Sequence, residues 1–181
     1  MNTKKRLFLI LGILIAAVAV YFVFFHDNEL PRPEIKSPTP LVEPEDHKYS
    51  FDNPPVFEKD IELRFIDQET KQIISEIDAE VADEHFERAL GLMYRPEMAD
   101  STGMLFVFEN ETEQAFWMRN TIISLDILYV NSDYEIVKIY KNTETLSDRS
   151  LPSGKASIYV VEVNAGYCDE HGIEEGDLVD F

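Results

Sequence analysis

The chain has 181 residues, one long apolar tract and a formal net charge of −19 at pH 7, with 35 acidic side chains against 16 basic ones. This length accommodates an anchor, a tether and one globular domain of ordinary size, which argues against two folded domains. The charge argues against nucleic acid as a partner, because binding it requires basic side chains that neutralise phosphates.

The first feature along the chain is an apolar stretch without a charged residue, residues 7–25. A helix of this length rises by about 1.5 Å per residue and reaches about 28 Å, close to the roughly 30 Å hydrocarbon thickness of a bilayer. We therefore predict one transmembrane anchor. Basic residues precede it and acidic residues follow it, so residues 1–6 are predicted to be a cytoplasmic stub and the rest of the chain to be exported.

A cleaved signal peptide is the alternative interpretation of the same stretch. Ala17 and Ala19 form the small-x-small pair that a signal peptidase site requires. The apolar run continues past them to Phe25, which favours an uncleaved anchor. The predicted location is the cytoplasmic membrane, crossed once, with the bilayer as a partner of residues 7–25 and the C-terminal domain in the periplasm or outside the cell.

A proline-rich segment, residues 26–57, follows the anchor and holds seven of the nine prolines. Proline fixes φ and removes a backbone donor, so this segment is predicted to be a semi-extended linker rather than a helix or a central strand. The prolines are Pro31, Pro33, Pro38, Pro40, Pro44, Pro54 and Pro55.

A globular domain is predicted over residues 58–181. Apolar and polar residues alternate over 61–66, as in a strand with one buried face, and 73–81 forms a second such run. Asp83 can then cap a short helix that ends near Tyr94, because Pro96 restricts the residue before it. The helix would bury one apolar face, formed by Phe86, Ala89, Leu90 and Met93.

The rest of the domain is predicted to form strands. They are expected at residues 104–108, 114–118, 125–130, 134–140 and 158–163, with a short final strand after the Gly176-Asp177 turn. Few residues remain for crossover helices. The predicted class is therefore α+β, a mostly antiparallel β-sheet or small barrel with one main short helix, preceded by the single transmembrane helix.

The segment Phe-Trp-Met-Arg-Asn-Thr at residues 116–121 is the most informative for function. In an extended chain Trp117 and Arg119 share one face, where they can stack on an apolar ring face and hydrogen-bond to hydroxyl or carboxylate groups beside it. Asn120 adds an amide next to them. The same side chains could instead cover the edge of the core.

Asp126 lies within an otherwise apolar strand, so a buried carboxylate there needs a partner. The available cations are Arg88, Arg95 and Arg119. Three roles remain open for this cluster: a structural ion pair, a ligand-binding site, or a catalytic site with Asp126 as acid or base.

Metal and cofactor sites are not indicated by the sequence. Cys168 is the only cysteine, which excludes an intramolecular disulfide, and it lies three residues before His171. Two ligands are too few for a zinc site, and no glycine-rich phosphate loop is present. We predict neither a metal nor a cofactor.

Several segments occur in order over about residues 81–177: Ala89–Arg95, Gly103–Phe108, Phe116–Thr121, Asn164–Gly166 and Gly176-Asp177. Together they resemble a known family, the bacterial and archaeal domain of unknown function 192, in which the first segment corresponds to a Gly-Leu-Met-x-Arg element. Arg119 stands where the family usually has lysine, and Ser124 where it usually has proline. The resemblance implies a compact, often exported domain, and it carries no agreed activity.

The leading functional hypothesis is a non-enzymatic domain that binds an envelope saccharide or peptide. The expected contacts come from Trp117, Arg119, Asn120 and Asp126, with Arg88 and Arg95 nearby. An envelope hydrolase with Asp126 as general base is one alternative, and a structural protein-interaction module is another. The sequence does not indicate an oligomeric state.

Overall fold

A computed structural model describes residues 48–181. The predicted stub (1–6), anchor (7–25) and most of the linker (26–57) lie outside the described residues. Within residues 48–181 no helix has the length and apolar character needed to span a membrane.

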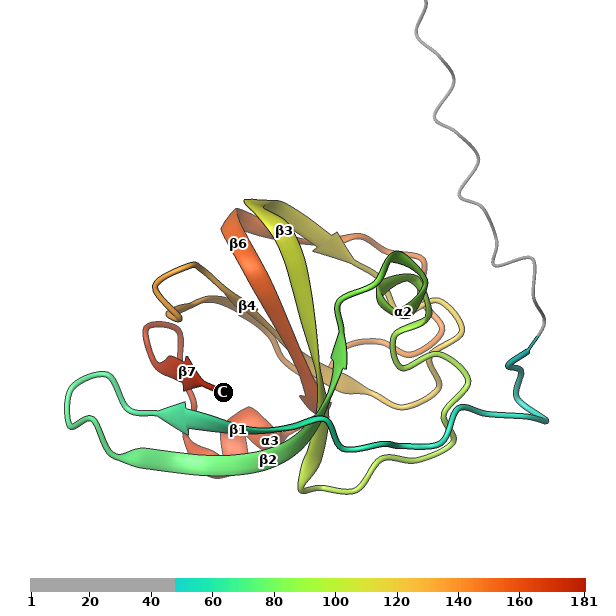
Figure 1. Ribbon diagram of the computed structural model, residues 1–181, viewed down its shortest axis with the longest axis horizontal. Helices are drawn as coiled ribbons and strands as arrows, with labels where there is room; N and C mark the ends of the chain where they lie inside the picture. The colour runs from blue at the N-terminus through green and yellow to red at the C-terminus, as the bar shows by residue number, and fades with distance from the viewer. Residues whose placement is uncertain (1–47) are drawn as a thin grey trace, which may run out of the picture. The chain divides into compact units, whose positions relative to one another are not determined.

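The described domain is built around one seven-stranded, strongly curved sheet, with two short helices (Figure 1). The strand order is β5-β4-β6-β3-β2-β1-β7, and every neighbouring pair is antiparallel except β2 and β3. The predicted mostly antiparallel β-rich domain is confirmed. The strands are β1 (Ile61–Ile66), β2 (Ile73–Ala82), β3 (Thr102–Phe116), β4 (Leu125–Val130), β5 (Ile136–Tyr140), β6 (Leu151–Asn164) and β7 (Leu178–Asp180).

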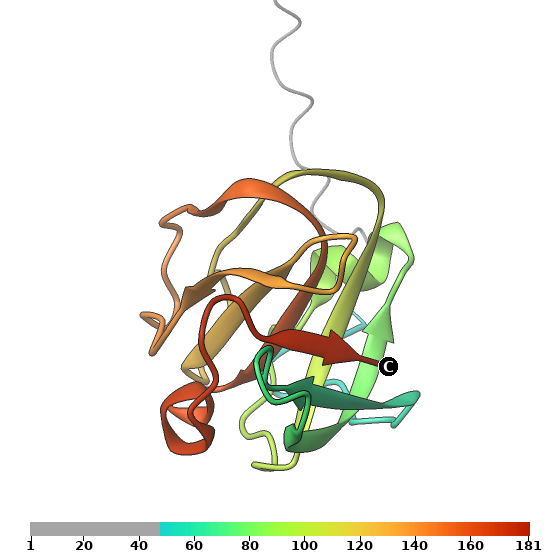
Figure 2. The same cartoon turned by 90° about the vertical axis from the view of Figure 1, so that its left-hand side faces the viewer.

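The curvature of the sheet makes a half-barrel whose two edges meet near the C-terminus. β7 pairs with β1 and also reaches the β4–β5 hairpin, where Glu135 bridges Leu178 and the Ile136 amide donates to the Asp177 carbonyl over 2.8 Å. Figure 2 shows β7 crossing this open side of the curved sheet. The predicted turn at Gly176-Asp177 thus brings the last strand to both edges.

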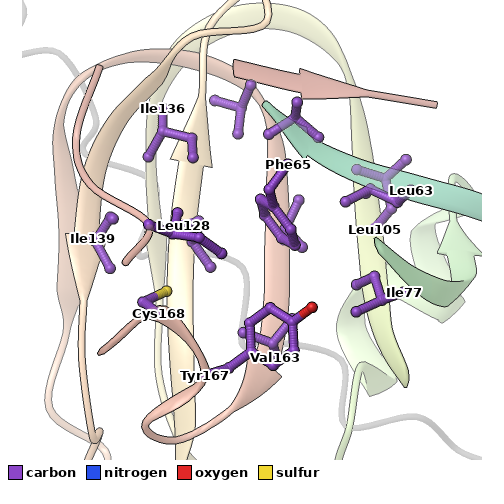
Figure 3. Packing of buried hydrophobic residues seen from close by; sticks show 14 of the residues in the cluster. Leu63, Phe65, Ile77, Leu105, Leu128, Ile136, Ile139, Val163, Tyr167 and Cys168 are labelled. Carbon is purple, nitrogen blue, oxygen red and sulfur yellow. The ribbon is translucent and has the colours of Figure 1, made fainter. Parts of the chain in front are cut away.

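The concave side of the sheet holds one core, which we call the inner cluster (Figure 3). Short helix α3 (Tyr167–His171) contributes Tyr167 and Cys168 to it, so this helix covers one end of the core. Residues from every strand except the short β7 are labelled in Figure 3: Leu63, Phe65, Ile77, Leu105, Leu128, Ile136, Ile139 and Val163.

A second core, the outer cluster, packs on the opposite face of the central strands. It explains why all six residues of β4 are buried, since that strand has a core on each side. The outer cluster contains Ala82, Leu92, Met104, Phe106, Met118, Leu125, Ile127, Tyr129, Val137, Leu151 and Val160.

Strand β3 is longer than the hydrophobic pattern predicts. The sequence indicated two strands, at 104–108 and 114–118, whereas the structure has one strand of 15 residues that pairs with β6 along most of its length. The exposed polar residues 109–113 interrupt the apolar pattern, and the β3–β6 pairing contains two register shifts there. Backbone pairing therefore continues where burial stops.

Helix α2 (His85–Leu90) is shorter than predicted. A reciprocal capping box between Glu84 and Glu87 begins it, and Gly91, with φ 48°, ends it. The predicted apolar face is wrong for this helix, because none of its residues is buried and Phe86 is 40% exposed. The segment after the helix, including Leu92, supplies the buried apolar contacts instead.

Gly103 marks a close approach between β3 and β6. A Cβ at this position would lie 2.6 Å from the Glu162 carbonyl oxygen and 2.8 Å from the Ile77 side chain. We expect Gly103→Ala to lower the free energy of unfolding by about 1–3 kcal/mol, because the backbone oxygen cannot yield without moving β6. Urea denaturation of both proteins measures this difference, and equal stabilities would contradict the close approach.

Candidate functional site

A small pocket of about 40 Å³ lies against the end of α2 on the outer-cluster side. Two segments that are distant in sequence form its walls, one running from Arg88 to Met93 and the other from Phe116 to Thr121. Both belong to the motifs that carry the family resemblance. The lining residues are Arg88, Ala89, Leu90, Gly91, Leu92, Met93, Phe106, Phe116, Trp117, Thr121 and Glu162.

Glu162 is the only carboxylate among the described residues that lines this pocket. It lies on β6 between Met104 of β3 and Ile127 of β4, both members of the outer cluster, and is only 4% exposed. Within residues 48–181 it has no ion-pair partner and its side chain makes no hydrogen bond. Burial raises the pKa of Glu162 to about 8, because an apolar environment disfavours the charged form.

Trp117 forms part of the pocket wall and is half-buried. The guanidinium carbon of Arg119 lies 4.0 Å from the centre of its ring, which is a close cation–π contact. Arg119 is held by Asp148, whose Oδ1 accepts a hydrogen bond from Nε over 2.7 Å. Arg119 is therefore a neighbour of Trp117, as predicted from their shared face, but does not line the pocket.

Arg88 also lines the pocket, and part of its hydrogen-bonding capacity is already used. Its NH1 donates to the carbonyl of Asp83 and, over 3.0 Å, to that of Val107. The guanidinium lies 5.5 Å from the centre of the Phe108 ring. These contacts fix Arg88 between α2 and β3 at the pocket.

Asn120 joins the two motif segments to each other. Its carbonyl accepts from the Tyr94 amide, and its Nδ2 donates to the Tyr94 hydroxyl, both over 2.9 Å. Asn120 and Tyr94 both have positive φ values, 54° and 66°. Asn120 thus holds the pocket walls together rather than facing the pocket.

Arg95 lies outside the pocket in a buried ion pair with Glu80 of β2. The distance from NH2 to Oε2 is 2.6 Å, although the contact lacks the alignment of a hydrogen bond. The other Glu80 oxygen accepts from the Glu58 amide over 3.0 Å. Arg95 therefore anchors the segment that follows α2 to the sheet.

Asp126 is sealed within the protein, with 0% exposure, and does not line the pocket. Its predicted arginine partner is not found among the described residues. Instead Oδ1 accepts from the Asn142 amide over 2.8 Å and Oδ2 from the Cys168 amide over 3.0 Å. The carboxylate links β4 to α3 and to the segment after β5, which is a structural role.

Of the six predicted site residues, the structure brings Trp117 and Arg88 to the pocket and Arg119 against Trp117. Sequence reasoning missed Glu162. Like Asp126, it is a single acid in an apolar run, Tyr-Val-Val-Glu-Val, but the local sequence does not indicate that it lines the same pocket as Trp117.

A second pocket, of about 240 Å³, lies beside Met118 and is lined mainly by polar residues between Tyr140 and Leu151. Of the two basic residues that line it, Lys141 pairs with Asp169 over 2.7 Å. Among residues 48–181 no group of three potential metal ligands is present. Cys168 is buried, and burial raises the pKa of its thiol, which makes it a poor nucleophile.

The raised pKa of Glu162 predicts a specific dependence of stability on pH. The folded protein keeps this proton up to about pH 8, whereas the unfolded chain loses it near its ordinary value of 4.5. The unfolded state binds fewer protons in that window, so the contribution of Glu162 to stability is fully present below it and is lost as pH rises. Its steepest slope is about 1.4 kcal/mol per pH unit.

Denaturation of the wild type and of Glu162→Gln at pH 5 and pH 8 tests this expectation. The glutamine cannot ionise, so the variant should gain stability relative to the wild type as pH rises. Glu144→Gln, at an exposed position, is the control for a general charge effect. A difference between wild type and Glu162→Gln that is independent of pH would contradict the desolvation of this carboxyl.

Comparison with known proteins identifies relatives but no curated function. A model of the family DUF192, described as Uncharacterized ACR, matches residues 66–181. None of the curated proteins matches this chain.

Two solved structures are similar, each with a TM-score of 0.63. One, from Sinorhizobium meliloti 1021, is described provisionally as a transcription regulator; it is 34% identical, and the match covers 66% of this chain and 91% of that one. The other is a protein of unknown function from Novosphingobium aromaticivorans DSM 12444, with 32% identity over 67% of this chain and 84% of that one. With a family match over 66–181, this chain belongs to the domain of unknown function 192 family.

Proposed function

We propose that the domain is a ligand-binding module of the cell envelope, tethered to the cytoplasmic membrane by residues 7–25, that recognises a saccharide or peptide. One observation carries the binding function: Glu162, a buried carboxyl with no partner among residues 48–181, lines the same pocket as Trp117. The uncharged stretch at 7–25 and the basic residues before it support the tether.

The pocket combines aromatic side chains with a few polar groups. Ligand sites use such fixed polar groups to orient the ligand beside apolar surface. Here Phe106, Phe116 and Trp117 provide apolar surface, while Glu162 and Thr121 provide polar groups. Arg119 and Asn120 support this wall through Trp117 and Tyr94.

A hydrolase is the second candidate, with Glu162 in place of Asp126. A carboxyl whose pKa is raised to about 8 stays protonated at pH 7 and can act as a general acid. Glycoside hydrolysis normally needs a second carboxylate across the scissile bond, and no other carboxylate lines this pocket. Asp126 cannot reach a substrate from its sealed position. The arrangement of the pocket residues therefore fits ligand binding better than hydrolysis.

One similar structure is described provisionally as a transcription regulator. We do not extend that role to this chain, because a net charge of −19 opposes contact with the phosphate backbone of DNA.

Fluorescence of Trp117, the only tryptophan in the chain, tests the binding function. The full-length protein, kept in mild detergent, is titrated with envelope saccharides and peptides. Saturable quenching is expected, with affinity at least tenfold weaker in Phe116→Ala, which removes pocket wall but keeps the fluorophore. Ile73→Ala, an exposed residue that does not line the pocket, is the control. Absence of a response to every saccharide and peptide would overturn the proposal.

The tether has its own test. The full-length protein should remain with membranes during alkaline carbonate extraction, and protease added to cells stripped of their outer barrier should digest the domain. Release by carbonate, or a domain that stays intact, would contradict membrane attachment or export.

A further inference from the structure

Three carboxylates are buried among the described residues, and only one of them has no partner. Glu80 pairs with Arg95 and accepts from the Glu58 amide. Asp126 accepts from two backbone amides. Glu162 has neither an ion pair nor a hydrogen bond within residues 48–181, and it lines a pocket. A buried polar group without a partner destabilises a fold. The position of the Glu162 carboxyl at a pocket therefore points to a ligand that supplies the missing polar partner.

The pocket admits a head group rather than a whole ligand. One water needs roughly 10–15 Å³ of such space, so a pocket of about 40 Å³ holds a few waters or one small polar group. A sugar ring or an amino-acid residue is larger than this. The bulk of a ligand must therefore remain outside, where the half-buried Trp117 can contact it.

The charges around the pocket favour a cation in that position. Among residues 48–181 no basic side chain pairs with Glu162, and Arg88, which lines the same pocket, donates to the carbonyls of Asp83 and Val107. Tyr129 of β4 lies close enough to interact electrostatically with Glu162; it is buried, and its hydroxyl donates to the Leu151 carbonyl. The net charge of −19 attracts cationic ligands at long range.

We infer that this pocket binds a primary ammonium group of the ligand, with the Glu162 carboxylate as its counter-ion. The inference rests on the proposed function and narrows the ligands to amine-bearing saccharides or peptides. An ammonium is compact and presents three donors, which suits a narrow pocket with one carboxylate. On binding, the protonated carboxyl loses its proton to solvent and the N–H groups of the ammonium donate to the carboxylate, so charge and protons balance.

The test compares matched ligands that differ only in the charge of the amine. The tripeptide Gly-Lys-Gly and the glucosamine trimer are titrated against the full-length protein beside their N-acetylated forms. The N-terminal amine is blocked in both forms of the peptide, so the two forms differ only in the charge of the lysine side-chain amine. Trp117 fluorescence reports binding, and calorimetry at pH 6.5 in two buffers of different ionisation enthalpy reports proton release.

We expect at least one free-amine ligand to bind tenfold or more tightly than its acetylated form, with release of close to one proton. Glu162→Gln should reduce the preference to less than threefold, while Glu144→Gln, the exposed control, should keep it. Equal binding of both forms, or an unchanged preference in Glu162→Gln, would overturn the ammonium inference and leave the proposed binding function standing. If no saccharide or peptide of either form binds, both proposals fail.

Discussion

Replacing Arg95 with alanine is expected to lower the free energy of unfolding by about 3–5 kcal/mol, because it leaves the buried Glu80 carboxylate without its cation. Both side chains of this pair are largely buried, and the separation of 2.6 Å from NH2 to Oε2 indicates direct contact. The cost comes from the uncompensated charge more than from the lost attraction, since a charge in an apolar environment has poor solvation.

Urea denaturation with matched variants separates these contributions. The double variant Glu80→Gln, Arg95→Met should recover much of the lost stability, because it removes the unpaired charge. Lys59→Ala breaks the exposed pair with Asp78 and should change the free energy of unfolding little, because solvent screens exposed ion pairs. A loss in Arg95→Ala as small as that in Lys59→Ala would show that the Glu80–Arg95 pair does not stabilise the fold.

Replacing Asp126 with alanine is expected to destabilise the protein by about 2–4 kcal/mol, because one buried and one part-buried backbone amide lose their acceptor and a fully buried unpaired group costs about 1–3 kcal/mol. The amides belong to Asn142 and Cys168. Asp126→Asn should lose less, about 1–3 kcal/mol, because its amide oxygen still accepts one of the two bonds.

The same variants distinguish a structural carboxylate from one that contacts a ligand. Ligand affinity measured by Trp117 fluorescence, at a temperature where each variant remains folded, should be unchanged in Asp126→Asn. Glu162→Gln should show the opposite pattern, weaker binding with little loss of stability at low pH. If Asp126→Asn keeps full stability and loses binding, the two carboxylates have been assigned the wrong roles.

The arginines predicted for the site take separate roles in the structure. Arg95 belongs to the Gly-Leu-Met-x-Arg element and anchors the pocket wall to β2 through Glu80. Arg119, which replaces the lysine usual in the family, uses its planar group to lie over Trp117 while Nε donates to Asp148. A lysine keeps the charge but lacks this planar group, so Arg119→Lys should alter the surroundings of Trp117.

The family, the β-rich class and most of the strands could be predicted from the amino-acid sequence. Strands 61–66 and 125–130 were predicted with their observed bounds, because alternating or continuous apolar residues report local burial directly. The contact between Trp117 and Arg119 was also foreseeable, since the two residues are only two positions apart, although the chain there forms a turn and not the extended segment that was predicted.

Tertiary structure alone decided which polar groups meet. The hydrophobic pattern indicates whether a residue is buried but not which groups it contacts. An arginine was therefore predicted as the partner of Asp126, whereas in the structure two backbone amides donate to its carboxylate. The β3–β6 pairing brings Met104 and Ile127 beside Glu162, and the parallel β2–β3 crossover carries residues 88–93 over it. These contacts join segments far apart in the chain. The place of the Glu162 carboxyl at the pocket could therefore be found only from the tertiary structure.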